Sequence, residues 1–101
     1  MTPSASSASE GPLDALGVIE TFTVASAVLA ADRAAKRASV RLLRIRLANG
    51  LGGKCFVTLT GEVADVRAAV EAGAKAASER RLLVRDVVIP RPHADLARYL
   101  G

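Results

Sequence analysis

The sequence predicts one α+β domain in which two helices cover one face of an antiparallel four-stranded sheet. Short runs of β-branched and other apolar residues mark four strands, and two longer stretches have helical spacing, in the order strand, helix, strand, strand, helix, strand. The chain has 101 residues, of which 50% are hydrophobic and only 3% aromatic. This length supports one two-layer core, and small Ala, Val and Leu side chains let the helices lie close to the sheet.

The first half of the domain is predicted to form a strand and a helix. Residues 13–21 (LDALGVIET) indicate a strand, in which Gly17 marks a bulge or the close approach of another backbone. Residues 23–39 indicate a helix with Thr23 as its N-cap. Asp32 and Lys36 are four residues apart and favour an ion pair on its surface. The expected buried stripe of this helix is Val24, Val28, Ala31 and Ala35.

Two strands joined by a glycine-rich loop follow the first helix. Residues 40–47 alternate apolar residues with arginines, apart from one slip at Leu42-Leu43, which predicts a strand with one wet face. The segment ANGLGG at 48–53 predicts a flexible loop, and residues 54–60 resume a strand. These two strands are therefore expected to be antiparallel neighbours.

The second helix and the last strand complete the pattern. Residues 62–80 form the helix, with acidic residues in its first turn and Arg80-Arg81 at its end, as the helix dipole favours. Residues 82–89 form the last strand, and residues 93–100 offer a final helical turn or two. Two similar units give an α+β sandwich of ferredoxin-like type. Its open sheet edges predict self-association. The stripe expected to be buried on this helix is Val63, Val66, Val70, Gly73 and Ala77.

The last strand ends in an unusual way, at VVIPRPHADL (residues 87–96). Pro90 and Pro92 remove two N–H donors and fix φ, so the chain must leave the sheet at Pro90. Arg91 is then presented at a rigid corner, which favours a recognition role, although a solvated surface arginine is the commoner case. The pattern alone leaves both interpretations open.

No catalytic or metal-binding constellation emerges from the sequence. Cys55 lies in an apolar run and predicts a buried, inert thiol, because one cysteine and one histidine do not complete a zinc site. Glu20 follows an apolar strand and is a candidate buried acid without a partner fixed by the sequence. The segment NGLGGK does not have the spacing of a phosphate-binding P-loop. We therefore expect no enzyme, no metal and no cofactor.

Charge and composition narrow the possible partners and location. The net charge of +4 raises nucleic acid as a partner, but the basic residues are scattered among carboxylates and no aromatic binding motif accompanies them. No apolar run reaches the length of a membrane span. Residues 1–12 are expected to be a disordered tail before a domain at 13–101, and the single cysteine fits a reducing cytoplasm. Neither nucleic acid nor membrane is an expected partner.

Four segments together resemble a known family. They are ALGVIET (15–21), AADRAAKRASV (30–40), GEVADVRAAVEAGAKAA (61–77) and VIPRPH (88–93), and they look like the BMC-domain hexameric shell proteins of bacterial microcompartments. The resemblance implies a permuted ferredoxin-like subunit with its helices on one face of a four-stranded antiparallel sheet. It also implies a six-fold disc, edge-to-edge tiling of discs into a facet, and a central pore for metabolites.

The resemblance assigns three residues to the edge of the disc. Lys36 matches the family's edge lysine, which lies antiparallel to its symmetry mate across the junction between hexamers. Arg91 matches the arginine of the P-R-P-H turn, which inserts at the same junction and donates to backbone carbonyls of the next hexamer. His93 follows in register and is implied to line that edge.

The resemblance places the pore in the loop between the two middle strands, where this sequence departs from the family. The region from Val40 to Gly61 is about two residues longer than in common members. Leu51, Gly52 and Gly53 are expected to line the channel, with Lys54 at or just behind its rim. Glycine N–H groups would favour small polar or anionic metabolites. The ligand cysteine of iron–sulfur shell proteins would fall at Leu51, so we expect no cluster at Cys55.

The expected function is a structural, self-assembling shell protein with a selective pore and no catalysis of its own. Its expected partners are further copies of itself, other microcompartment shell proteins and encapsulated enzymes. The main rival is a ferredoxin-like regulatory oligomer that binds a small ligand, and a nucleic-acid-binding module is a more distant one. Only the shell interpretation requires a hexamer that goes on to form sheets.

Overall fold

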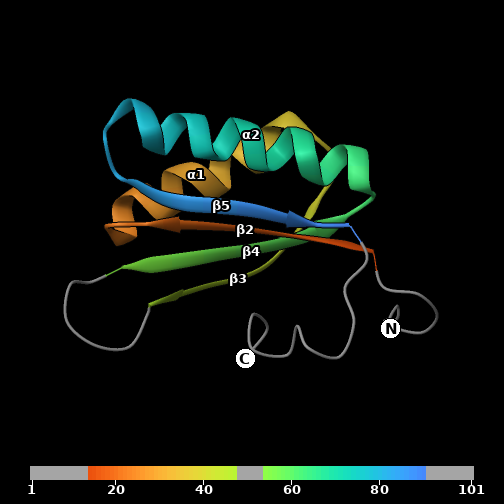
Figure 1. Ribbon diagram of the computed structural model, residues 1–101, viewed down its shortest axis with the longest axis horizontal. Helices are drawn as coiled ribbons and strands as arrows, with labels where there is room; N and C mark the ends of the chain where they lie inside the picture. Colours follow the sequence, from red (N-terminus) through yellow and green to blue (C-terminus); the bar gives the residue numbers. More distant parts are fainter. Residues whose placement is uncertain (1–13, 48–53, 91–101) are drawn as a thin grey trace.

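The structure, a computed structural model, describes residues 14–47 and 54–90. Along the chain they form β2 (Ala15–Thr21), α1 (Val24–Arg37), β3 (Arg41–Leu47), β4 (Cys55–Gly61), α2 (Val63–Glu79) and β5 (Leu83–Ile89). The four strands form one antiparallel sheet in the order β3-β4-β2-β5. Both helices lie on the same side of this sheet (Figure 1). The predicted α+β class, the order of elements and the ferredoxin-like arrangement are confirmed.

The strand register explains which side chains meet the helices. Ile19 pairs with Val57, and both side chains are fully buried in the core between sheet and helices. The β3–β4 register shifts between Leu42 and Arg44, at the position where the alternation of the sequence slips. Beyond this bulge the arginines of β3 pair with Thr58 and Phe56 on the face of the sheet that is opposite the helices. β3 and β4 are antiparallel neighbours, also as predicted.

Helix α1 begins with the expected cap but buries a different face from the one predicted. The Thr23 hydroxyl accepts a hydrogen bond from the Ser26 N–H at 3.0 Å, and the Ser26 hydroxyl accepts one from the Thr23 N–H, which completes a capping box. Of the predicted stripe only Ala31 is buried. Val24, Val28 and Ala35 are exposed, and the buried residues are Ser26, Ala27, Ala30, Ala31 and Ala34.

The reason for this shift is how closely α1 approaches α2. A Cβ on Gly73 would lie 2.7 Å from the Ala30 carbonyl oxygen and 2.7 Å from the Ile19 Cδ1 atom. Only alanines and glycine fit a contact this close, so the smallest residues of α1 are buried and its valines face outward. The α2 stripe is confirmed except at its first residue, since Val63 is 36% exposed. At Gly17 the close neighbours are the Val66 and Val70 side chains rather than a backbone.

Gly73→Ala should destabilise the fold, even though alanine is the better helix former. The helix propensity gains about 1 kcal/mol, but the added methyl meets a backbone carbonyl that cannot rotate away. We expect a net loss of about 1–2 kcal/mol in the free energy of unfolding, measured by urea denaturation. An unchanged or higher denaturation midpoint would show that α1 and α2 are not in such close contact.

Three predicted features lie outside the described residues: the tail at 1–12, the glycine loop at 48–53 and the final helical turns at 93–100. Within residues 14–47 and 54–90, no helix combines the length and apolar character needed to cross a membrane.

Candidate functional site

An apolar surface remains uncovered at the β3 edge of the sheet. The register places Leu42, Ile45 and Leu47 on the side of β3 that faces the helix layer, yet they are 44%, 37% and 57% exposed. The expectation of one wet face on β3 is therefore wrong for the single chain, in which both faces are open. The cause is topological, because β3 is an edge strand and α1 also lies over β2 and β4.

The exposed valines of α1 extend this surface. Arg33 and Arg37 of α1 line a groove shared with α2. Because successive residues of a helix are rotated by about 100° around its axis, Val24 and Val28 lie on the opposite flank of α1. Since α2 lies over β2 and β5, that flank faces the β3 side. We call Val24, Val28, Leu42, Ile45 and Leu47 together the apolar edge surface. Such a surface indicates a protein partner.

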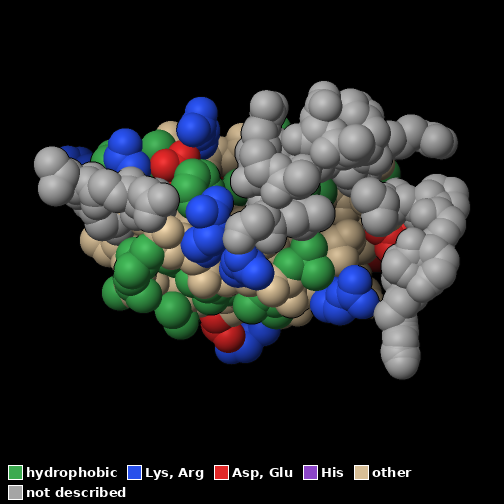
Figure 2. Space-filling model, turned by 90° about the horizontal axis from the view of Figure 1, so that it is seen from below, with side chains coloured by type: hydrophobic (Ala, Val, Ile, Leu, Met, Phe, Trp, Pro, Cys, Tyr) green, Lys and Arg blue, Asp and Glu red, His purple; other side chains and the backbone are tan. Residues whose placement is uncertain are grey.

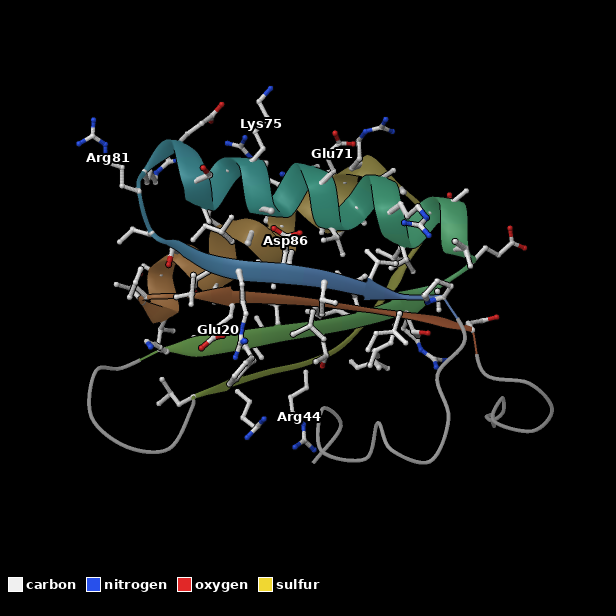
Figure 3. The ribbon with its side chains drawn as sticks, in the orientation of Figure 1. Glu20, Arg44, Glu71, Lys75, Arg81 and Asp86 are labelled. Atoms are coloured by element: carbon white, nitrogen blue, oxygen red, sulfur yellow. The ribbon has the colours of Figure 1, made fainter. Side chains whose placement is uncertain are left out.

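On the far side of the molecule, α2 and β5 border a second depression. It has a volume of about 360 Å³ and combines apolar side chains with charged ones. Figure 3 shows Asp86 between β5 and α2, and Glu71 and Lys75 on α2. The apolar edge surface and this depression therefore lie at opposite ends of the sheet order. The residues that line the depression are Arg67, Val70, Glu71, Ala74, Lys75, Ser78, Leu83, Asp86 and Val88.

The edge residues predicted from the sequence are only partly described. Lys36 lies in the last turn of α1 with its side chain 73% exposed, and its Nζ atom is 3.1 Å from the Asp32 carboxylate. The predicted ion pair is thus confirmed. The Lys36 ammonium is exposed to solvent, as a residue at the edge of the disc requires. Arg91 and His93 lie outside the described residues.

Of the four predicted pore residues, only Lys54 is described. It is half-buried directly before β4, and its Nζ atom lies 5.9 Å from the centroid of the Phe22 ring. A cation over an aromatic face at this distance is attracted to it. Leu51, Gly52 and Gly53 lie outside the described residues.

The open face of the sheet carries a charged arrangement that sequence reasoning missed. The Arg85 Nε atom donates to the Glu20 carboxylate at 2.8 Å, and Arg46 lies 5.2 Å from the Phe56 ring centroid. Figure 2, seen from below, shows Lys and Arg side chains gathered across this face, and Figure 3 places Glu20 and Arg44 on it. Glu20 is buried as predicted, and its partner follows from the β2–β5 register, in which it pairs with Arg85.

Arg85→Met should cost about 1–2 kcal/mol in the free energy of unfolding, because it leaves the buried Glu20 carboxylate without its cation. The effect stays below that of a fully buried pair, since the Arg85 side chain is 75% exposed and water screens it. Thermal or urea denaturation measures the loss. The matched double variant Glu20→Gln with Arg85→Met should regain part of it. Equal stability of the single and double variants would mean that the Glu20 carboxylate costs nothing without its cation.

Cys55 is a core residue and not a surface ligand. It is 1% exposed within the cluster between sheet and helices, as predicted. Burial raises the pKa of its thiol above the ordinary value of 9.0, although a backbone hydrogen bond at Phe56 opposes the shift. The protonated thiol is a poor nucleophile and a poor metal ligand. In the described part of the chain, no three His, Cys, Asp or Glu residues gather as a metal site would require.

Comparisons with known proteins agree with this architecture. Residues 15–92 match the BMC domain. The chain is 45% identical to the bacterial microcompartment shell protein PduT of Citrobacter freundii over 86 residues, which are 85% of this chain and 47% of PduT. It is 42% identical to the shell protein EutM of Salmonella typhimurium over 84 residues, which are 83% of this chain and 85% of EutM.

A solved structure gives the same result in three dimensions. A microcompartment protein from Desulfitobacterium hafniense superposes with a TM-score of 0.79 at 55% sequence identity, covering 88% of this chain and 49% of that one. The chain therefore spans about half the length of PduT and of the Desulfitobacterium protein, and most of the length of EutM.

Proposed function

Because this chain belongs to the BMC domain family, we propose that it is a structural protein of a bacterial microcompartment shell in the cytoplasm. In this role six copies form a disc, discs tile edge to edge with one another and with other shell proteins, and the protein catalyses no reaction. The observation that carries the proposal is the apolar edge surface. Its five large side chains are all more than a third exposed in the single chain, which favours burial against another copy.

A head-to-tail ring accounts for the position of this surface. The apolar edge surface and the depression between α2 and β5 lie at opposite ends of the sheet order. The apolar edge surface of one copy can therefore contact the depression of the neighbouring copy. When two different patches of neighbouring copies bind each other and the repeated rotation returns to the first copy, the copies form a closed ring rather than a two-fold dimer. This arrangement supports the hexamer that the family resemblance implies.

The central pore is proposed at the loop of residues 48–53, with Leu51, Gly52 and Gly53 at the channel and Lys54 behind them. Six lysine ammonium groups in a narrow ring would repel one another by about 1 kcal/mol per near pair. The contact between Lys54 and Phe22 supports a position in which the ammonium is held away from the axis. The opening would then be lined by backbone N–H groups and suit small polar or anionic metabolites.

Electron microscopy of the purified protein tests the proposal. We expect flat sheets with a six-fold lattice and one pore at the centre of each disc, because tiling needs no partner other than further copies. Electron crystallography of such sheets should place residues 48–53 at the six-fold axis. Discrete particles without two-dimensional order would contradict the tiling, and a lattice with this loop at the outer edge would contradict the pore assignment.

A further inference from the structure

A basic groove lies between the C-terminal halves of α1 and α2. Its volume is about 370 Å³, within the range of small-molecule sites. Figure 3 shows Lys75 directed away from the sheet, so the groove opens on the helix side of the molecule. The residues that line it are Arg33, Lys36, Arg37, Ala72, Lys75, Ala76 and Glu79.

The groove has a clear excess of positive charge. Four cations line it against the single lining carboxylate of Glu79, and Asp32 on the same helix as Lys36 pairs with that lysine. Arg33, Arg37 and Lys75 form no ion pair with any residue in 14–47 or 54–90. The charged lining residues together with Asp32 therefore carry a net charge of +2, and three of the cations lack a charged partner among the described residues.

The packing of the two helices holds these cations together. The close contact of α1 and α2 at Gly73 sets the distance between the helices. The alanines of α2 in the groove, Ala72 and Ala76, have short side chains and leave space between the longer cationic ones. A ligand that neutralises several cations at once relieves their mutual repulsion, and guanidinium groups match phosphate and carboxylate oxygens through paired hydrogen bonds.

We propose that this groove binds a small polyvalent oxyanion with at least two phosphate or carboxylate groups, and that its occupancy promotes tiling. The first part requires only one chain. The second part rests on the proposed function, in which Lys36 approaches its symmetry mate across the junction between discs. An anion bound beside Lys36 lowers the repulsion between the two facing basic edges.

Calorimetric titration of the full chain with pyrophosphate, in a phosphate-free buffer at constant ionic strength, tests the site. We expect saturable binding of one anion per chain, about tenfold weaker in Arg33→Gln and in Lys75→Gln because each loses a charge-assisted hydrogen bond. Arg41→Gln is the matched control, since it removes the same charge from the opposite face of the sheet. It should bind as the wild type does.

Citrate in a parallel titration separates phosphate from carboxylate ligands. We expect citrate to compete for the same site with lower affinity, and binding of either anion that requires Arg33 and Lys75 supports the proposal. No saturable binding of either anion, or an equal loss in Arg41→Gln, would overturn it. Sheet formation with and without pyrophosphate then tests the effect on tiling, while the titration remains interpretable even for a chain that forms no hexamer.

Discussion

Val28→Glu should convert the assembled protein into monomers. Val28 is 52% exposed in the single chain and belongs to the apolar edge surface, which the proposed ring buries at each of its six junctions. A carboxylate without a partner in such an interface costs about 3 kcal/mol, which lowers the association constant of each junction about 100-fold. Because every copy carries the substitution, the ring has no intact junction left. Sedimentation velocity at micromolar concentration measures the change.

Val28→Leu is the control for this experiment, because it changes the same position and keeps the surface apolar. It should remain assembled, and circular dichroism should show the same fold for both variants. Leu47→Glu places the charge on β3 instead of α1 and should also give monomers. If Val28→Glu and Leu47→Glu both remained assembled, the apolar edge surface would not be the interface.

Lys36→Ala and Arg91→Ala should keep the hexamer and lose the sheets. In the proposed shell both residues act between discs, so the ring does not depend on them. Each junction loses about 1 kcal/mol per contact, and the loss is repeated around the disc by symmetry. Electron microscopy should show separate discs where the wild type shows ordered arrays, and the sedimenting mass of the disc should not change.

Asp32→Asn is the matched control for Lys36→Ala. It breaks the ion pair of 3.1 Å but keeps the Lys36 ammonium, and an exposed pair of this kind contributes at most about 1 kcal/mol to stability. Sheets should therefore persist in Asp32→Asn. Loss of sheets in this variant would mean that the ion pair, and not the ammonium, is what the edge requires. Dissociation of the hexamer in Lys36→Ala or Arg91→Ala would place that residue within the ring.

The order of strands and helices was predictable because it depends on local periodicity. The alternation of arginine and apolar residues in β3, including the slip that became a bulge, is a property of adjacent residues. The Thr23 cap and the Asp32–Lys36 pair are equally local. All of these follow from spacings of four residues or fewer.

The features that were missed depend on contacts between distant residues. Val24 and Val28 have helical spacing and were assigned to the core, but the close contact at Gly73 and Ala30 turns the alanine face inward. Arg85 and Glu20 are 65 residues apart along the chain, and only the register of β2 and β5 makes them partners. The assignment of residues to the edge and the pore still rests on the family resemblance. The structure adds only the exposed position of Lys36 and the contact of Lys54 with Phe22.

Sedimentation equilibrium of the wild-type protein, at low micromolar concentration and without added ligand, tests the central claim most directly. Below the concentration at which discs form sheets, we expect a single species with the mass of six copies of the 10.5 kDa chain. This mass should not change on further dilution, because a closed ring has no unburied apolar edge surface. A monodisperse monomer or dimer under these conditions would contradict the account.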